Sequence, residues 1–316
     1  MPGPAGRPES GTVLVIKPLH AVRDLSSHPA AGGCRSASPG GFTLVELLVV
    51  LAVIGTLVGM LLPAVLRVRE SGRQTQCGNN VHNMALGVLS YASSKRYFPP
   101  GCDAVPAGAS LPNGTQHAWS SYILPFIEES AISNRIDYKK FWNASGGNDV
   151  ASDSTVSLYI CPSGMVSFNG KADYGGISGT YLAARGQVNP AADPSHNGIL
   201  TWLDADHRSF ITPASASDGL SHTLLIGESV DRGLQDVVDP DMNGRWGRGT
   251  NAFPQNAPFV NIFENESIRS RHLRGAQTAF ADGRVMFLSD TMDPDVLAAI
   301  CTRNGGETCA SAVNAP

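Results

Sequence analysis

The strongest pattern along the chain is a run of hydrophobic positions from Leu47 to Leu66, directly preceded by one acidic residue, Glu46. No residue in the run carries a formal charge. At about 1.5 Å per residue, a helix over this run crosses the roughly 30 Å hydrocarbon layer of a membrane. We therefore predict a membrane-spanning helix, with a kink at Pro63 that such a span tolerates.

Beyond this run the pattern changes to helical periodicity. Apolar residues recur at helical spacing with polar residues between them, as on an amphipathic helix. The apolar residues are Val81, Met84, Ala85, Val88, Tyr91 and Ala92. No proline lies between Pro63 and Pro99. We therefore predict one helix from Phe42 to about Ser94, roughly 80 Å long, half in the membrane and half packed on a head.

The remainder of the chain consists of short apolar runs separated by turn residues. A turn-rich segment from Tyr97 to Asn113 ends the long helix, and Leu124 to Ile136 is predicted as a short helix. The spacing of the later runs favours antiparallel strands. The predicted strands are Val156 to Ile160, Ile177 to Ala183, Gly198 to Leu203, Ser209 to Thr212, Thr223 to Gly227, Gln277 to Ala281 and Val285 to Leu288.

Two local signals lie near the C-terminus. Ala281 to Arg284 contains Asp282 and Gly283 between the last two predicted strands, which predicts a tight hairpin with a type I′ turn. A short helix from Pro294 to Cys301, with Asp293 as its N-cap, follows. The predicted fold class is α+β.

Composition narrows the class of protein. The net charge of −4 gives no electrostatic footprint for nucleic acid, so we predict no nucleic-acid partner. Residues 1–40 are rich in Gly, Ala, Pro and Ser and are interpreted as a leader. Removing the leader removes Cys34 and leaves five of the six cysteines, an odd number. Cys301 and Cys309 flank a Gly-Gly turn and are the candidate disulfide. The sequence contains no CxxC pair, so we predict no zinc site.

Signals for catalysis are missing from the sequence. It contains no GxSxG, HExxH, Walker or GxGxxG motif, so we predict that the protein is not an enzyme. Ser270, His272 and Asp282 have the residue types of a triad. The favoured interpretation is structural, with His272 hydrogen-bonded in the head and Asp282 and Gly283 selected for turn geometry.

Two binding hypotheses have weaker support. Asp239, Asp241 and Asn243 precede Gly244 as in the opening of a calcium loop, but position twelve is Thr250 and supplies no bidentate carboxylate. A plain loop is favoured, so we predict no cofactor or metal, with calcium as the alternative. The four tryptophans suit either a glycan platform or a core, and the core is favoured. They are Trp119, Trp142, Trp202 and Trp246.

Glu46 requires explanation, because an acid in an apolar helix costs a few kcal/mol to bury. Either it lies at the headgroup level or it has a cationic partner. Gly41, Phe42 and Glu46 resemble the type IV prepilin cleavage and methylation signature. This resemblance implies that prepilin peptidase cuts between Gly41 and Phe42, that the new Phe42 amine is methylated, and that Glu46 neutralises the amine of a neighbouring subunit.

The later sequence is similar to the domain-of-unknown-function 1559 family of pilin-like proteins. The similarity follows from the order of blocks, which are Cys77 with Asn79 and Asn80, FPPG (98–101), LPFIE (124–128), Cys161-Pro162-Ser163 and SDGLSHTLLIGES (217–229). It also includes His272, nine residues, then Asp282-Gly283, the signature of the family's C-terminal region. Arg284 departs mildly from the small residue expected there.

Together these observations predict a pilin-like long N-terminal helix packed on a mainly antiparallel β-sheet head. The expected parts are a leader (1–41), the helix (42–94) and an extracytoplasmic head (95–316). We expect a single-pass protein of the bacterial inner membrane, with its head in the periplasm or at the cell surface. Its expected partners are prepilin peptidase, membrane lipid and other pilin-like or pseudopilin-like subunits, as in type II secretion. The alternative is a membrane-tethered glycan-binding module that does not polymerise.

Overall fold

The computed structural model describes residues 41–103, 114–165, 167–182, 196–203, 210–232, 244–262 and 266–306. The chain divides into two compact units, and the boundary along the sequence lies between Thr56 and Leu57. The N-terminal helix α1 comprises Leu44–Lys95, and Pro63 lies inside it without ending it. The prediction of one helix running through both the apolar run and the amphipathic segment is confirmed.

The unit that begins at Leu57 contains one five-stranded sheet with the order β3-β1-β2-β4-β5. The strands are β1 (Tyr174–Thr180), β2 (Leu224–Glu228), β3 (Ala252–Gln255), β4 (Gly275–Phe280) and β5 (Val285–Ser289). Three pairings are antiparallel, and β1 pairs with β3 in parallel. The predicted fold, α+β with a mainly antiparallel sheet, is therefore confirmed.

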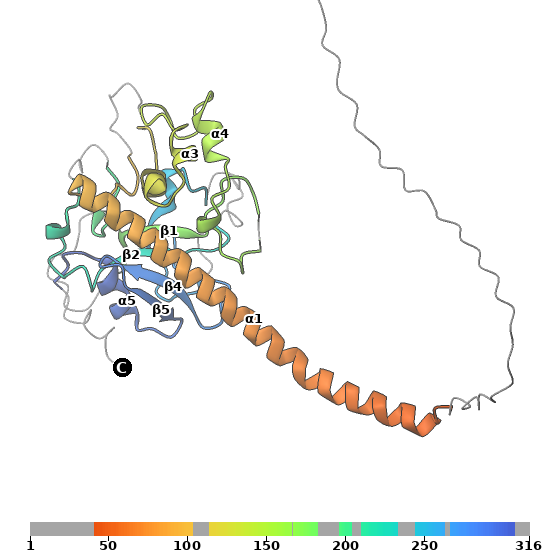
Figure 1. The fold of residues 1–316 in the computed structure, drawn as a ribbon. Helices are drawn as coiled ribbons and strands as arrows, with labels where there is room; N and C mark the ends of the chain where they lie inside the picture. Colours follow the sequence, from red (N-terminus) through yellow and green to blue (C-terminus); the bar gives the residue numbers. More distant parts are fainter. Residues whose placement is uncertain are drawn as a thin grey trace, which may run out of the picture. The chain divides into compact units, whose positions relative to one another are not determined.

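Each face of the sheet is covered by a different helix. The buried residues of α1, among them Val81 and Met84, share a core with Ala279 of β4, and Figure 1 shows this part of α1 crossing the sheet. Phe280, the next residue of β4, belongs to a second core with Leu297 of α5 (Pro294–Cys301). Successive strand residues point to opposite faces, so α1 and α5 pack on opposite sides of the sheet.

Short helices surround this sheet. They are α2 (Trp119–Ile123), η1 (Leu124–Phe126), α3 (Ser130–Ser133), α4 (Asn148–Ser152), η2 (Ser157–Tyr159), η4 (Pro213–Ser215) and η5 (Gly249–Asn251). The prediction of one helix from Leu124 to Ile136 is wrong, because the chain there forms η1, a turn and α3. The helix is interrupted at Glu128, whose φ of 66° lies outside the right-handed helical region.

Several strand predictions are also wrong. Val156 to Ile160 contains the 3₁₀ turn η2, whose Tyr159 hydroxyl donates a hydrogen bond to the carbonyl of Ser120. Gly198 to Leu203 and the described residues 210–212 form no strand. Conversely, β3 was not predicted. It contains Pro254, and its partner β1 lies far away in the sequence, so no local pattern indicates it.

The C-terminal predictions are confirmed with one correction. β4 and β5 form an antiparallel hairpin, and α5 begins after Asp293, whose carboxylate accepts a hydrogen bond from the Asp295 N–H. A type I′ turn requires positive φ at both central residues, but Gly283 has a φ of 91° and Asp282 is not among the positive-φ residues. The Phe280 N–H donates to the Arg284 carbonyl and the Gly283 N–H donates to the Phe280 carbonyl, which closes a three-residue loop with glycine in the left-handed position.

Candidate functional site

The expected processing site precedes the first turn of α1. Gly41 and Phe42 lie just outside the helix, and the Phe42 side chain is 78% exposed. Among the described residues, and apart from its chain neighbours, no atom lies within 4 Å of the position that a Cβ on Gly41 would occupy. The described part of the chain therefore does not cover either residue.

Glu46 takes part in a capping box with Thr43. The Thr43 N–H and hydroxyl donate hydrogen bonds to Glu46 Oε2, at 2.9 and 2.8 Å. In return the Glu46 N–H donates to the Thr43 hydroxyl, at 3.2 Å. Thr43 is the N-cap and Glu46 the third helical residue, which is the spacing of the S/T-x-x-E box. The T-L-V-E sequence carried this capping signal, but Glu46 was interpreted only as an acid at the headgroup level or as an assembly contact.

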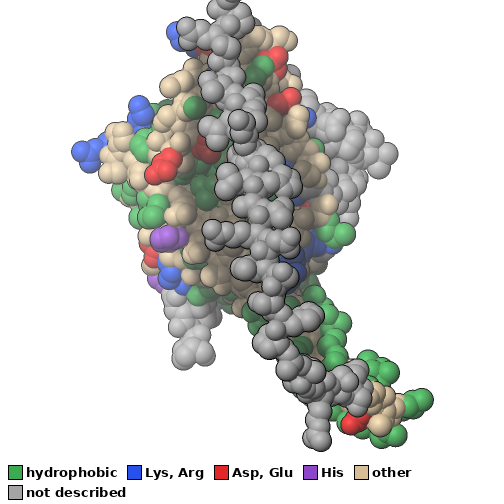
Figure 2. Space-filling view, turned by 45° about the vertical axis from the view of Figure 1, so that its right-hand side comes forward, with side chains coloured by type: hydrophobic (Ala, Val, Ile, Leu, Met, Phe, Trp, Pro, Cys, Tyr) green, Lys and Arg blue, Asp and Glu red, His purple; other side chains and the backbone are tan. Residues whose placement is uncertain are grey.

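The apolar run that follows is exposed along its length. The large side chains from Leu44 to Leu66 that are exposed by about half or more include Leu47, Leu51, Leu57, Met60 and Leu62. Hydrophobic side chains form this surface at the lower right of Figure 2. By length and composition α1 is able to cross a membrane.

The head contains a buried cluster of four side chains that come from four separate segments. Cys77 lies on α1, Cys161 follows η2, Glu228 ends β2 and His272 precedes β4, and all are buried. The two Sγ atoms lie 2.9 Å apart, and Cys161 Sγ lies 3.8 Å from His272 Nε2. His272 Nε2 lies 3.3 Å from Glu228 Oε1. All four donor atoms lie within 4.8 Å of one another.

Further hydrogen bonds hold this cluster in position. His272 Nδ1 lies 2.7 Å from Oε1 of Glu70 on α1, and the Ser163 hydroxyl also donates to that carboxylate. The Cys161 N–H donates to Asp173 Oδ2 at 2.9 Å, and Asp173 is itself paired with the buried Lys171 ammonium at 2.9 Å. Both ring nitrogens of His272 therefore have partners: Nδ1 contacts Glu70, and Nε2 faces the other members of the cluster.

The electrostatics of the cluster favour a cation at His272. Burial by itself lowers the pKa of His272, but its interactions with Cys161, Glu228 and Glu70 outweigh burial and raise the pKa to about 10. Burial would raise the pKa of Glu70, yet its pairing with His272 brings that pKa below the usual value. A hydrogen bond from Cys77 lowers the pKa of the Cys161 thiol. One carboxylate thus faces each ring nitrogen of His272, with Glu70 at Nδ1 and Glu228 at Nε2.

The His272 and Asp282-Gly283 signature does not form a triad. Asp282 lies in the β4–β5 turn, where its carboxylate accepts a hydrogen bond from the Arg284 N–H at 2.9 Å. A Cβ on Gly283 would lie 3.1 Å from Leu89 Cδ1 of α1. His272 and Gly283 therefore contact α1 at two points, one beside Glu70 and one beside Leu89. The Ser270 hydroxyl donates to the Gly275 carbonyl and accepts a hydrogen bond from the backbone N–H of His272, so it does not face the imidazole as a triad serine would.

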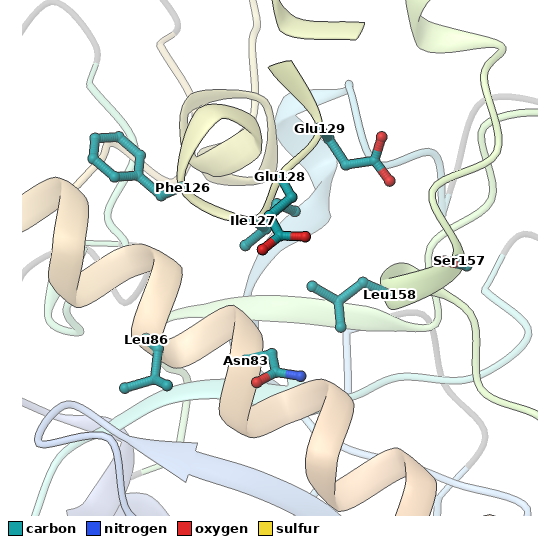
Figure 3. A pocket seen from close by; sticks show the side chains of 8 residues that line it. All are labelled: Asn83, Leu86, Phe126, Ile127, Glu128, Glu129, Ser157 and Leu158. Carbon is teal, nitrogen blue, oxygen red and sulfur yellow. The ribbon is translucent and has the colours of Figure 1, made fainter. Parts of the chain in front are cut away.

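The surface of the head also has a pocket of about 550 Å³ beside α1. Its lining residues are Asn83, Leu86, Phe126, Ile127, Glu128, Glu129, Ser157 and Leu158. Figure 3 shows Asn83 and Leu86 on α1 opposite the turn that carries Glu128 and Glu129. The lining mixes apolar and acidic side chains, and we assign no ligand to it.

The remaining predicted site residues fall into two groups. Asp239, Asp241 and Asn243 of the calcium hypothesis, and Cys309 of the predicted disulfide, lie outside the described residues. Cys301 is buried in α5. Trp119, Trp142 and Trp246 are at most 2% exposed, and Trp202 donates its indole N–H to the Ala252 carbonyl. These side chains are structural, and they do not form an exposed aromatic platform.

The cluster was not predicted from the sequence, although the family blocks contained Cys77, Cys161, Glu228 and His272. Cys77 and Cys161 are 84 residues apart, and Glu70 and His272 are 202 apart. Glu228 and Glu70 were not singled out at all. The one available signal was the position of Cys77 on the apolar face of the amphipathic helix, seven residues before Met84.

An exposed apolar N-terminal helix, followed by an α+β head, defines the class of pilin-like proteins. In agreement, the prokaryotic N-terminal methylation motif matches residues 38–62, which supports a type IV pilin-like precursor. The family described as "Protein of unknown function (DUF1559)" matches residues 67–295, more than half of the chain, and the protein belongs to this family. No curated protein and no solved structure matches the chain significantly.

Proposed function

We propose that the protein is a structural subunit of a type IV pilin-like or pseudopilin-like assembly. Prepilin peptidase cuts the precursor between Gly41 and Phe42, and the apolar half of α1 anchors the mature chain in the bacterial inner membrane. The head then lies in the periplasm or at the cell surface. The observation that carries this proposal is the coincidence of the methylation motif at 38–62 with the start of an exposed apolar helix.

The geometry of Glu46 suits a role in assembly. Both hydrogen bonds from Thr43 go to Oε2, and no described residue donates a hydrogen bond to Oε1. Cutting before Phe42 leaves Thr43 and this capping box in place. Oε1 therefore stays available for the methylated amine of a neighbouring subunit, and pairing the two charges offsets the cost of placing each in an apolar layer.

Glu46 caps the helix together with Thr43, and it also supplies a negative charge for the amine of a neighbouring subunit. A matched pair of variants separates these two roles. Glu46→Gln keeps a side chain that caps the helix but removes the charge. Thr43→Val removes the hydroxyl from the box and keeps the charge. We expect Glu46→Gln to abolish chain-to-chain crosslinked ladders in intact cells, and Thr43→Val to retain them.

The measurement is crosslinking in cells that express the full chain, with membrane fractionation and N-terminal sequencing to show that both variants insert and are cut. Equal loss of ladders in both variants would mean that Glu46 acts only through the helix cap. Ladders that persist in Glu46→Gln would contradict pairing with an amine and would favour a tethered subunit that does not polymerise.

A further inference from the structure

We propose that Cys77, Cys161, Glu228 and His272 form a binding site for a divalent transition-metal ion of the zinc class. The proposal concerns the head and the buried half of α1, and it is independent of how the apolar half of α1 assembles. Two thiolates, one imidazole and one carboxylate form a donor set typical of zinc, which prefers sulfur and nitrogen ligands together with an occasional carboxylate oxygen.

The distances from His272 Nε2 to Cys161 Sγ and to Glu228 Oε1 suit a four-coordinate ion. Bonds of about 2.0–2.3 Å to a tetrahedral zinc ion hold neighbouring donor atoms about 3.3–3.8 Å apart. The separation of Cys161 Sγ and His272 Nε2 is 3.8 Å, and that of His272 Nε2 and Glu228 Oε1 is 3.3 Å. The two Sγ atoms, at 2.9 Å, are closer than this range, so binding moves them apart by less than about 1 Å.

Glu228 gives an independent reason to expect a cation here. Its side chain is fully buried, and its Oε2 accepts a hydrogen bond from the Gln277 N–H at 2.7 Å. Its Oε1 lies 3.3 Å from His272 Nε2 but accepts no hydrogen bond of good geometry from the part of the chain that the structure describes. Burying a carboxylate oxygen without a hydrogen bond is costly, and a metal ion among the four donors would satisfy this oxygen together with the imidazole.

The surroundings of His272 have the arrangement found around metal-bound histidines. Such a histidine usually donates its other ring N–H to a carboxylate, which fixes the tautomer and orients the ring. Here Nδ1 faces Glu70 Oε1 at 2.7 Å, while Nε2 faces the cluster. Glu70 is further held by the Ser163 hydroxyl. Glu70 is therefore a positioning residue for the proposed site.

A bound ion would join α1 to three other segments of the head. Cys77 is seven residues from Glu70 on the same helix, and the remaining donors come from the segment after η2, from the end of β2 and from the segment before β4. Metal binding to a site of this kind contributes to folding free energy, because the unfolded chain has no preformed site. The metal would therefore stabilise the docking of α1 on the head.

The test uses the full chain, purified in detergent without chelators. We expect about one zinc ion per chain by elemental analysis, as one four-donor site requires. We also expect Co²⁺ added to the metal-depleted chain to give thiolate-to-cobalt charge-transfer absorption. Cys77→Ser should remove this absorption, and Cys102→Ser, a buried cysteine outside the cluster, should retain it.

Glu70→Gln provides a second test that leaves all four donors intact. We expect it to weaken Co²⁺ affinity by about 10–100-fold, the usual effect of removing such a partner. A wild-type chain that contains no metal and binds no Co²⁺ would overturn the proposal. So would a Cys77–Cys161 disulfide in the purified chain, seen as the loss of two hydrogen atoms by mass, since it consumes both thiolates.

Discussion

The two halves of α1 are equally helical but differ in what covers their apolar side chains. From Leu44 to Leu66 the large hydrophobic side chains are exposed, whereas from Cys77 to Ala92 one face is buried against the sheet. Exposed apolar surface of this extent indicates a partner outside the chain, either lipid or another apolar helix. A single helix thus combines a segment that needs an external partner with one that completes the core of its own head.

The same contrast holds for the two acidic residues of α1. Glu46 is bound within its own first turn by Thr43, so a local sequence pattern accounts for its contacts. Glu70 is bound to His272, which lies 202 residues away. No described residue donates a hydrogen bond to Oε1 of the first acid, whereas the second acid holds a histidine in the interior of the head.

The largest effect that this comparison predicts comes from truncating a methionine in each half. Met84 is fully buried, so Met84→Ala should lower the free energy of unfolding of the head by about 2–5 kcal/mol. Met60 is 76% exposed, so Met60→Ala should leave that free energy unchanged. Denaturant unfolding of the full chain in detergent, followed by the fluorescence of the buried tryptophans, measures both.

This pair is decisive because the substitution is the same and the helix is the same. Equal destabilisation by both variants would contradict the division of α1 into an uncovered and a covered half. A neutral Met84→Ala would show that the second half does not pack on the sheet as described.

A smaller effect is expected where the β4–β5 turn contacts α1. Gly283 has a φ of 91°, and a Cβ there would lie 3.1 Å from Leu89 Cδ1. Gly283→Ala should cost about 1–2 kcal/mol from the left-handed backbone alone. Leu89→Ala combined with Gly283→Ala separates the two causes, since it relieves the contact but not the backbone strain. A Gly283→Ala head as stable as wild type would rule out the observed turn.

The smallest predicted effect has the opposite sign. Gly72 lies in α1, exposed, and nothing lies within 4 Å of a Cβ placed on it. Alanine is favoured over glycine inside a helix by about 0.5–1 kcal/mol. Gly72→Ala should therefore stabilise the helix, with a higher unfolding midpoint. Destabilisation instead would mean that another surface packs closely on α1 at this position.

How much of the fold the sequence predicts depends on whether the determining contacts are local. The 3.6-residue period predicts α1, and the turn residues around Asp282 predict the β4–β5 hairpin, because these signals act over a few residues. The type of the β4–β5 turn was predicted wrongly, because it depends on the backbone angles of Asp282 and Gly283. β3 was missed, and Val156 to Ile160 was predicted as a strand, because pairing with β1 and the burial of Tyr159 are long-range.

The candidate sites divide in the same way. Gly41, Phe42 and Glu46 lie within six positions, so their motif was readable from the sequence. The absence of CxxC suggested that zinc is absent, yet Cys77 and Cys161 come together in the fold from 84 residues apart. Spacing rules for metal sites apply to ligands on one short loop, and they miss ligands that separate segments bring together.

The most direct test of the central proposal is mass spectrometry of the N-terminus of the chain isolated from native membranes. The proposed processing predicts a mature chain that begins at Phe42 with a methylated amine and lacks residues 1–41. A chain that keeps residues from the 1–41 segment, or that begins elsewhere than Phe42, would contradict it.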